Sequence, residues 1–147
     1  MDSTATIPDV VTHPTLLFRV GSDLHGCDIG NAQEIIPLRA VTRIPGAPAY
    51  VRGLINMRGT IVTVLDLGVR LDPSRSPVSE GSILLIRHHE HVVGIVVDEV
   101  LDMRLLEIDV DEARGSRASV VRGVATFDGA AVIVLDLDAL ITQVLLS

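Results

Sequence analysis

Apolar residues come in short runs along most of the chain, and turn-forming residues separate one run from the next. The runs that are almost continuously apolar and rich in β-branched side chains are residues 61–67, 83–87, 92–100 and 132–137. Their lengths and their Gly, Pro or Asp boundaries are typical of buried β-strands. Nearer the start, the runs 16–20 and 24–29 flank a Gly-Ser-Asp turn, which is the spacing of a β-hairpin. The pattern predicts an all-β protein.

Glycines mark the turns between these runs. Asp128-Gly129 is the strongest hairpin signal in the chain, because both central residues of a type I′ turn need a positive φ. Gly59 occupies a similar place and predicts a second tight hairpin. Residues 71–82 hold two prolines without periodicity and predict a connection between halves, whereas residues 1–14 are polar and predict a mobile tail.

An internal repeat appears when the sequence is shifted against itself by 70 positions. Residues 51–67 (VRGLINMRGTIVTVLDL) then lie over 121–137 (VRGVATFDGAAVIVLDL), and nine of these seventeen positions are identical. A weaker similarity relates residues 16–19 to residues 84–87. Shared β-composition is the alternative explanation, although exact glycine spacing is hard to reach by composition alone. The repeat predicts two copies of one unit of four or five short strands, which usually curl into small barrels packed together.

Composition and charge limit the kinds of partner and the cellular location expected for this chain. The chain has 147 residues, which suits one domain or two small lobes sharing a core, and 48% of them are apolar although only Phe18, Tyr50 and Phe127 are aromatic. The net charge of −7 opposes binding to nucleic acid or anionic lipid and favours a monomer. Cys27 has no partner for a disulfide, and no apolar run is long enough for a membrane span, so we predict a cytoplasmic protein.

The repeat carries a family resemblance. Residues 50–67 (YVRGLINMRGTIVTVLDL) resemble the signature of the CheW coupling proteins, in which Asn, an apolar residue, Arg and Gly precede a buried strand ending in Asp-Leu. Residues 21–35, 41–51 and 92–103 resemble other parts of that family, so the similarity covers about residues 16–141. Thr63 departs from it, because the family usually has proline there.

The resemblance implies the fold and its boundaries. CheW-like domains consist of two small five-stranded SH3-like β-barrels that share a hydrophobic core, followed here by a short C-terminal helix. We therefore expect residues 15–147 to form a CheW-like domain, with one lobe at about 15–80 and the other at about 81–147. Residues 1–14 would precede it as the flexible tail.

The resemblance also implies a function. CheW-like proteins are non-catalytic adaptors that couple a CheA-type histidine kinase, through its regulatory domain, to the cytoplasmic tip of chemoreceptors (methyl-accepting chemotaxis proteins). No cofactor or metal is implied, and the protein would reach membrane receptor arrays through its partners. A divergent member that serves gliding, pili or development and has lost one partner surface stays open as an alternative.

The same resemblance implies that the receptor-binding residues are Ile29, Ala32, Glu34, Ile35 and Arg58. The three apolar residues would line a groove that accepts one face of a receptor helix, although an ordinary core role is the alternative. We expect a salt bridge between Glu34 and Arg58, because an arginine on a glycine-flanked turn presents a planar fork to a carboxylate.

The resemblance assigns kinase binding to Val41, Arg43, Gly53 and Asn56. These residues lie in or beside the proline-containing loop and at the start of the signature. Gly53 recurs in the repeat as Gly123, which favours a role in backbone geometry over direct contact.

Two clusters point to other chemistry. His88-His89-Glu90-His91 contains good ligands for zinc or nickel, but it falls between two apolar strands, where a solvated turn is expected. Asp66 and Asp136 are related by the repeat, and a pair of aspartates can divide acid and base roles in a hydrolase. Both end apolar strands, where aspartate commonly caps a turn. Cys27 is expected to be a small buried hydrophobe, and we predict no enzyme activity.

Overall fold

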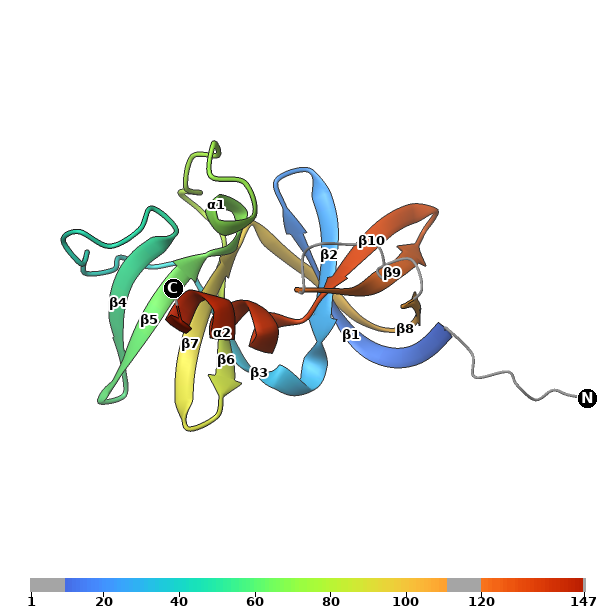
Figure 1. The fold of residues 1–147 in the computed structure, drawn as a ribbon, viewed down its shortest axis with the longest axis horizontal. Coiled ribbons are helices and arrows are strands. Elements are labelled where there is room, and N and C mark those ends of the chain that lie inside the picture. Colours follow the sequence, from blue (N-terminus) through green and yellow to red (C-terminus); the bar gives the residue numbers. More distant parts are fainter. Residues whose placement is uncertain (1–9, 111–119, 147) are drawn as a thin grey trace, which may run out of the picture.

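Two five-stranded sheets make up most of residues 10–110 and 120–146, the parts of the chain that the computed structural model describes (Figure 1). The first sheet is a closed barrel of β1 (Val10–Val20), β2 (Asp23–Asp28), β10 (Ala130–Leu135), β9 (Val121–Phe127) and β8 (Glu99–Asp109), in that order. The second sheet has the order β3 (Ala32–Pro37), β6 (Ser82–His88), β7 (His91–Val97), β5 (Thr60–Asp66) and β4 (Val51–Met57). The short helices are η1 (Ile29–Asn31), α1 (Leu67–Leu71) and α2 (Leu137–Leu146). The all-β prediction with a short C-terminal helix is confirmed.

The sheets exchange strands between the two halves of the chain. The barrel takes its first two strands from the start of the chain and the other three from the end, whereas the second sheet takes the five strands between them. The boundary that we expected near residue 80 therefore does not follow the sheets. Equivalent parallel pairings produce this exchange: β10 pairs with β2 at Val134↔Gly26, and β5 pairs with β7 at Val64↔Gly94. Each repeated hairpin completes the sheet begun by the other half.

The sheets share one hydrophobic core. Its largest cluster joins Leu16 and Phe18 of the barrel to Leu84 and Ile95 of the second sheet, all of them fully buried. Helix α2, red in Figure 1, adds Leu137, Leu140 and Ile141 to the same cluster. Smaller clusters fill the interior of each sheet separately. The predicted shared core of aliphatic side chains is confirmed.

Both predicted hairpin turns have left-handed residues at their tips. The φ angles are 52° at Arg58 and 89° at Gly59, and 51° at Asp128 and 79° at Gly129. The flanking strands meet at Met57↔Thr60 and Phe127↔Ala130. Positive φ at both central positions matches the right-handed twist of the strands and closes each hairpin tightly.

Several predicted boundaries were wrong. Strand β1 begins at Val10, so residues 10–14 are not part of a tail; residues 1–9 lie outside the described part. Residues 10–14 form a strand because they pair with β8, and the paired residues Val10 and Asp109 lie 99 positions apart in the chain. The predicted strand 92–100 is interrupted at Asp98, whose N–H donates to the carbonyl of Arg19 at 3.0 Å.

Within the described ranges, no helix has the length and apolar character needed to cross a bilayer.

Candidate functional site

An apolar groove of about 380 Å³ lies where the barrel meets β3. It is lined by Leu16, Ile29, Ala32, Gln33, Glu34, Ile35 and Met103. Two of its apolar side chains are open to solvent, with 42% of Ile35 and 61% of Met103 exposed. The structure thus brings four of the five predicted receptor-binding residues into one concave surface, and only Arg58 lies outside it.

Local geometry explains how consecutive residues of β3 line the same groove. The Asp28 carboxylate accepts a hydrogen bond from the Gly30 N–H at 2.8 Å and caps η1, which turns the chain from the barrel into the second sheet. Strand β3 then pairs with β6 at Ala32↔Ile86 and Glu34↔Leu85, with a register shift between them. A strict strand would alternate its side chains between two faces, but a bulge re-aims them. The bulge brings Ala32 and Ile35, which pair with Ile86 and Leu84, to the same face of the sheet, and Glu34 reaches the groove from its edge.

The predicted salt bridge between Glu34 and Arg58 is present. Glu34 Oε1 accepts a hydrogen bond from Arg58 Nη2 at 2.5 Å, and the two side chains are 40% and 68% exposed. Exposed ion pairs contribute about 0–1 kcal/mol to stability. This pair lines a second, smaller hollow, so Glu34 is shared between that hollow and the apolar groove. The exposure of both side chains leaves the pair accessible from solvent.

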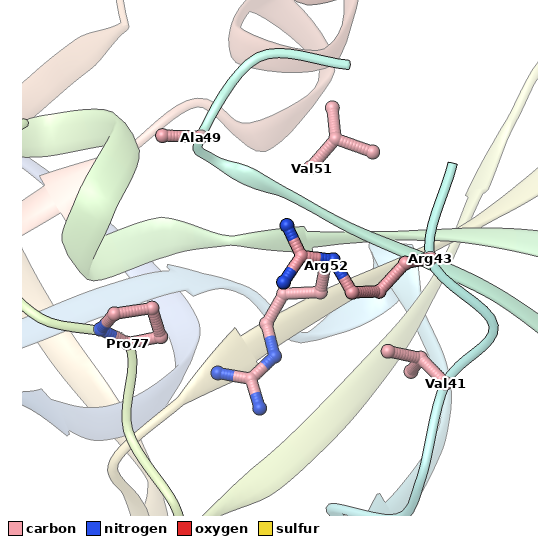
Figure 2. Close-up of a pocket in the computed structure, with 6 residues that line it drawn as sticks. All are labelled: Val41, Arg43, Ala49, Val51, Arg52 and Pro77. Atoms are coloured by element: carbon pink, nitrogen blue, oxygen red, sulfur yellow. The ribbon is translucent and has the colours of Figure 1, made fainter. Parts of the chain in front are cut away.

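A separate pocket of about 350 Å³ lies on the second sheet (Figure 2). It is lined by Val41, Arg43, Ala49, Val51, Arg52 and Pro77, so two of the four predicted kinase-binding residues belong to it. Gly53 and Asn56 do not line it. We refer to it below as the arginine pocket, because both of its charged side chains are arginines (Figure 2).

Gly53 and Asn56 have structural roles close to the arginine pocket. Gly53 is buried at φ +143°, and a Cβ there would lie 2.1 Å from the Thr42 carbonyl oxygen. The Asn56 side-chain oxygen accepts a hydrogen bond from the Gly59 N–H at 2.8 Å and so closes the β4–β5 turn. Gly53 allows the preceding loop to approach β4, as its recurrence in the repeat indicated.

Some lining residues were missed by the sequence analysis. Met103 and Leu16 join the groove because β8 pairs with β1 at Leu16↔Met103, a contact between strands almost 90 residues apart. No local pattern signals such a contact. Arg52 could have been singled out from the sequence, because it recurs in the repeat as Arg122. The two arginines have different partners: Arg52 pairs with Asp66, and Arg122 lies 3.9 Å from Asp28.

The histidine cluster is only partly the solvated turn that was predicted. Residues 89–91 are exposed, but His88 is 6% exposed, so the prediction was wrong for that residue. Its Nδ1 lies 3.2 Å from Asp138 Oδ1, and its Nε2 lies 3.5 Å from Thr142 Oγ1. Helix α2 covers this end of β6, which a local sequence pattern does not reveal. No group of three or more potential metal-ligating side chains is present among the residues with described positions.

The repeated aspartates were expected to cap turns, and the turns that they cap are the first turns of helices α1 and α2. Asp66 Oδ1 accepts a hydrogen bond from the Val69 N–H at 3.1 Å, and Asp136 Oδ1 accepts one from the Ala139 N–H at 3.0 Å. Asp66 also pairs with Arg52 Nη1 at 3.1 Å. Asp66 is the last residue of β5 and Asp136 directly follows β10, and each carboxylate holds the first turn of the helix that comes next, which is a structural use of both groups.

The predicted burial of Cys27 is confirmed, since its side chain is a free thiol with no exposed surface. Burial, with a smaller contribution from the charge of Asp28, raises the pKa of the Cys27 thiol from 9.0 to about 12. A buried thiol of this kind is a poor nucleophile at neutral pH, because the thiolate is the reactive form.

This pKa predicts a loss of stability in alkali. The folded-state pKa lies above the unfolded value, so the stabilisation is complete below pH 9 and decreases as the pH rises toward 12. Between pH 8 and pH 10, we expect the wild type to lose about 1.4 kcal/mol more unfolding free energy than Cys27→Ala, which has no titrating thiol. Urea unfolding at both pH values measures this difference, and parallel losses in the two proteins would contradict it.

Comparisons with known proteins agree with these features. A family profile described as the CheW-like domain matches residues 14–145. The chemotaxis protein CheW of Rhizobium meliloti is 32% identical over 130 residues, which cover 84% of each chain. The crystal structure of the scaffolding protein TtCheW from Thermoanaerobacter tengcongensis superposes with a TM-score of 0.73 at 25% identity, covering 86% of this chain and 90% of that one.

Other matches are shorter. Protein PilI of Pseudomonas aeruginosa is 29% identical over 96 residues, which cover 63% of this chain and 52% of PilI. Across this and several further relatives, the chain spans only 52–58% of the relative's own length.

Proposed function

This chain belongs to the CheW-like family, and from that premise we propose that it is a non-catalytic adaptor coupling chemoreceptors to a CheA-type histidine kinase. The observation that carries the proposal is the presence of two separate concave surfaces on one scaffold, the apolar groove and the arginine pocket. An adaptor needs one surface for each of two partners. The shared core holds these surfaces in a fixed relation.

The apolar groove is the proposed receptor site. Chemoreceptor tips are helical, and a helix can lay one apolar face into a groove of this kind. Ile29, Ala32 and Ile35 would contact that face, and Met103 would close the other side. Glu34 and Arg58 at the edge would supply polar contacts, which fix orientation more than they add affinity.

The arginine pocket and the loop before β4 form the proposed kinase site. Val41 and Arg43 would contact the regulatory domain directly, whereas Gly53 and Asn56 would support the loop and the turn beside them. No cofactor or metal is needed for such a role. We place the adaptor in the cytoplasm, as a monomer that its partners recruit to membrane receptor arrays.

A second candidate is a coupler for a pathway that serves pili. The match to PilI of Pseudomonas aeruginosa favours it, although it covers only part of both chains. The two candidates differ in partner choice: a general coupler binds both a receptor tip and a kinase, whereas a divergent coupler that has lost one surface binds only one of them.

Glu34→Lys tests the proposed function, because it changes the edge of the groove and leaves the arginine pocket intact. We expect the wild type to bind both the kinase regulatory domain and the receptor tip with micromolar affinity, as is usual for small signalling interfaces. The variant should bind the receptor tip about tenfold more weakly and the kinase unchanged, because lysine repels Arg58 and removes the edge carboxylate. Isothermal titration calorimetry with each partner measures both affinities.

Glu107→Lys is the matched control, because it makes the same charge change at an exposed position of β8 outside the apolar groove. It should leave both affinities unchanged. If the wild type does not bind the regulatory domain of any CheA-type kinase from the same genome, the coupling function is wrong. If Glu34→Lys and Glu107→Lys weaken receptor binding equally, the effect is one of net charge and the groove is not the receptor site.

A further inference from the structure

We infer that the arginine pocket binds a carboxylate side chain of the partner protein, with an apolar neighbour of that side chain seated against the pocket walls. This inference rests on the proposed function for the identity of the partner, the kinase regulatory domain, and adds the chemistry by which the pocket recognises it. The argument depends on the two guanidinium groups, their charge balance and the walls around them.

Arg43 is the free cation of the pocket. Its side chain has no hydrogen bond or ion pair with any residue whose position the structure describes, and the residue is exposed. Figure 2 shows it entering from the loop before β4 while Arg52 enters from β4 itself. An arginine that is not used within the protein presents its planar fork to an incoming acceptor.

Arg52 is held in place by hydrogen bonds that use only one of its three guanidinium nitrogens. Its Nη1 donates to Asp66 Oδ2 at 3.1 Å and to the Val78 carbonyl at 2.8 Å. Both bonds use the same nitrogen, so within the described part of the chain Nε and Nη2 have no hydrogen-bond acceptor. These two bonds fix the direction of the side chain, which is 18% exposed, and so reduce the entropy lost when it binds a partner.

The backbone also positions Arg43. Thr42 and Leu54 exchange hydrogen bonds, with the Thr42 N–H 2.9 Å from the Leu54 carbonyl oxygen and the Leu54 N–H 2.8 Å from the Thr42 carbonyl oxygen. This bridge ties the loop to β4 immediately before Arg43. Arg43 therefore directly follows a paired residue, and Arg52 lies between the paired residues Val51 and Gly53, so the backbone on at least one side of each arginine is held and binding needs little rearrangement.

The charge balance favours a carboxylate over a phosphate. Asp66 neutralises Arg52, so the pocket keeps about one unbalanced positive charge, from Arg43, in a protein whose net charge is −7. A carboxylate carries one negative charge and therefore balances the one positive charge of Arg43. The guanidinium group of arginine binds a carboxylate through two parallel hydrogen bonds. A phosphate group carries about −1.5 to −2 charges near neutral pH and would be left partly uncompensated.

The walls and the size indicate a side chain within a peptide, rather than a small free anion. Val41, Ala49, Val51 and Pro77 surround the two arginines with apolar surface. At about 30 Å³ per water molecule, a volume of about 350 Å³ holds roughly twelve waters, which is more than one carboxylate displaces. An apolar residue next to the acidic one would fill the remainder, and its burial would strengthen the ion pair by excluding water.

The first experiment tests the pocket chemistry without the kinase. The side-chain Nε–H signals of Arg43 and Arg52 are followed by NMR while N-acetyl-Glu-Leu-amide, N-acetyl-Gln-Leu-amide or inorganic phosphate is added to the full chain. We expect saturable shifts of both signals with the Glu peptide at millimolar concentration, and at least fivefold weaker responses to the Gln peptide and to phosphate. Equal responses to the Glu and Gln peptides, or a stronger response to phosphate, would overturn the inference.

The second experiment tests the partner. Arg43→Gln is titrated with the kinase regulatory domain, and Arg104→Gln, which makes the same charge change at an exposed position of β8, serves as the control. We expect Arg43→Gln to weaken binding about fivefold to tenfold and to reduce its salt dependence, and Arg104→Gln to leave both unchanged. Equal affinities of Arg43→Gln and the wild type would overturn the assigned partner while the adaptor function stands. Failure of the wild type to bind the kinase would instead overturn the proposed function, and the peptide result would still stand.

Discussion

Replacement of Gly53 by alanine is expected to lower the unfolding free energy by about 3–5 kcal/mol. Two costs add. The residue has a φ of +143°, which side chains rarely adopt, and the new Cβ would lie 2.1 Å from the Thr42 carbonyl oxygen. Relieving that contact moves Thr42 away from β4 and breaks its two hydrogen bonds with Leu54. Urea unfolding followed by circular dichroism measures the change.

Gly46→Ala is the matched control for this prediction. Gly46 also has a positive φ, of +81°, but nothing lies within 4 Å of the position that its Cβ would occupy. We expect this variant to lose only about 1 kcal/mol, the cost of the backbone conformation alone. Similar losses in both variants would show that close approach of the loop to β4 is not what requires glycine at position 53. A stable Gly53→Ala protein that no longer binds the kinase would instead assign Gly53 to the interface.

Replacement of Ala32 by arginine is expected to weaken binding to the receptor tip at least about 30-fold while changing the unfolding free energy by less than about 1 kcal/mol. Ala32 is half-buried and lines the open groove, so a large side chain there fills the space that a receptor helix would occupy. The long arginine stem can lie along the apolar groove with its charge in water, which limits the cost to the free protein. Calorimetric titration and thermal unfolding measure the two effects.

Ala131→Arg is the control for the groove. Ala131 is an exposed alanine of β10 that does not line the groove, and the substitution adds the same charge and bulk. Its receptor affinity should match that of the wild type. If Ala32→Arg unfolds the protein, Ala32 belongs to the core, since it packs against the largest hydrophobic cluster. If the folded variant binds the receptor tip normally, the helix does not occupy this groove.

The residues that the sequence assigned to the sites fall into two groups. Ile29, Ala32, Glu34 and Ile35 are neighbours in the chain, and the structure keeps them together in the groove. Gly53 and Asn56 are also close in sequence to Arg43, but they have backbone and turn roles instead of lining the arginine pocket. The family resemblance therefore predicted residues that lie in or near each concave surface, whereas the direction of each side chain depended on pairing and bulges that a linear pattern does not contain.

Features set by consecutive residues were determined by the sequence itself. The short β-branched runs predicted strands, because their side chains fit a pleated and buried surface. The turns at Gly59 and Gly129 were predictable because only certain residues accept a positive φ. The repeat predicted two similar units with a shared core, since each unit alone buries too little apolar surface to be stable.

Only the tertiary structure decided which strands lie side by side. The exchange of hairpins between halves, the extension of β1 to Val10, the place of Met103 in the groove and the burial of His88 under α2 all depend on partners 30 or more residues apart in sequence. Backbone hydrogen bonds carry no side-chain identity, so a strand pattern shows that a partner exists without showing which one. The partner is chosen by the packing of the whole core, where the apolar faces of both halves are buried together.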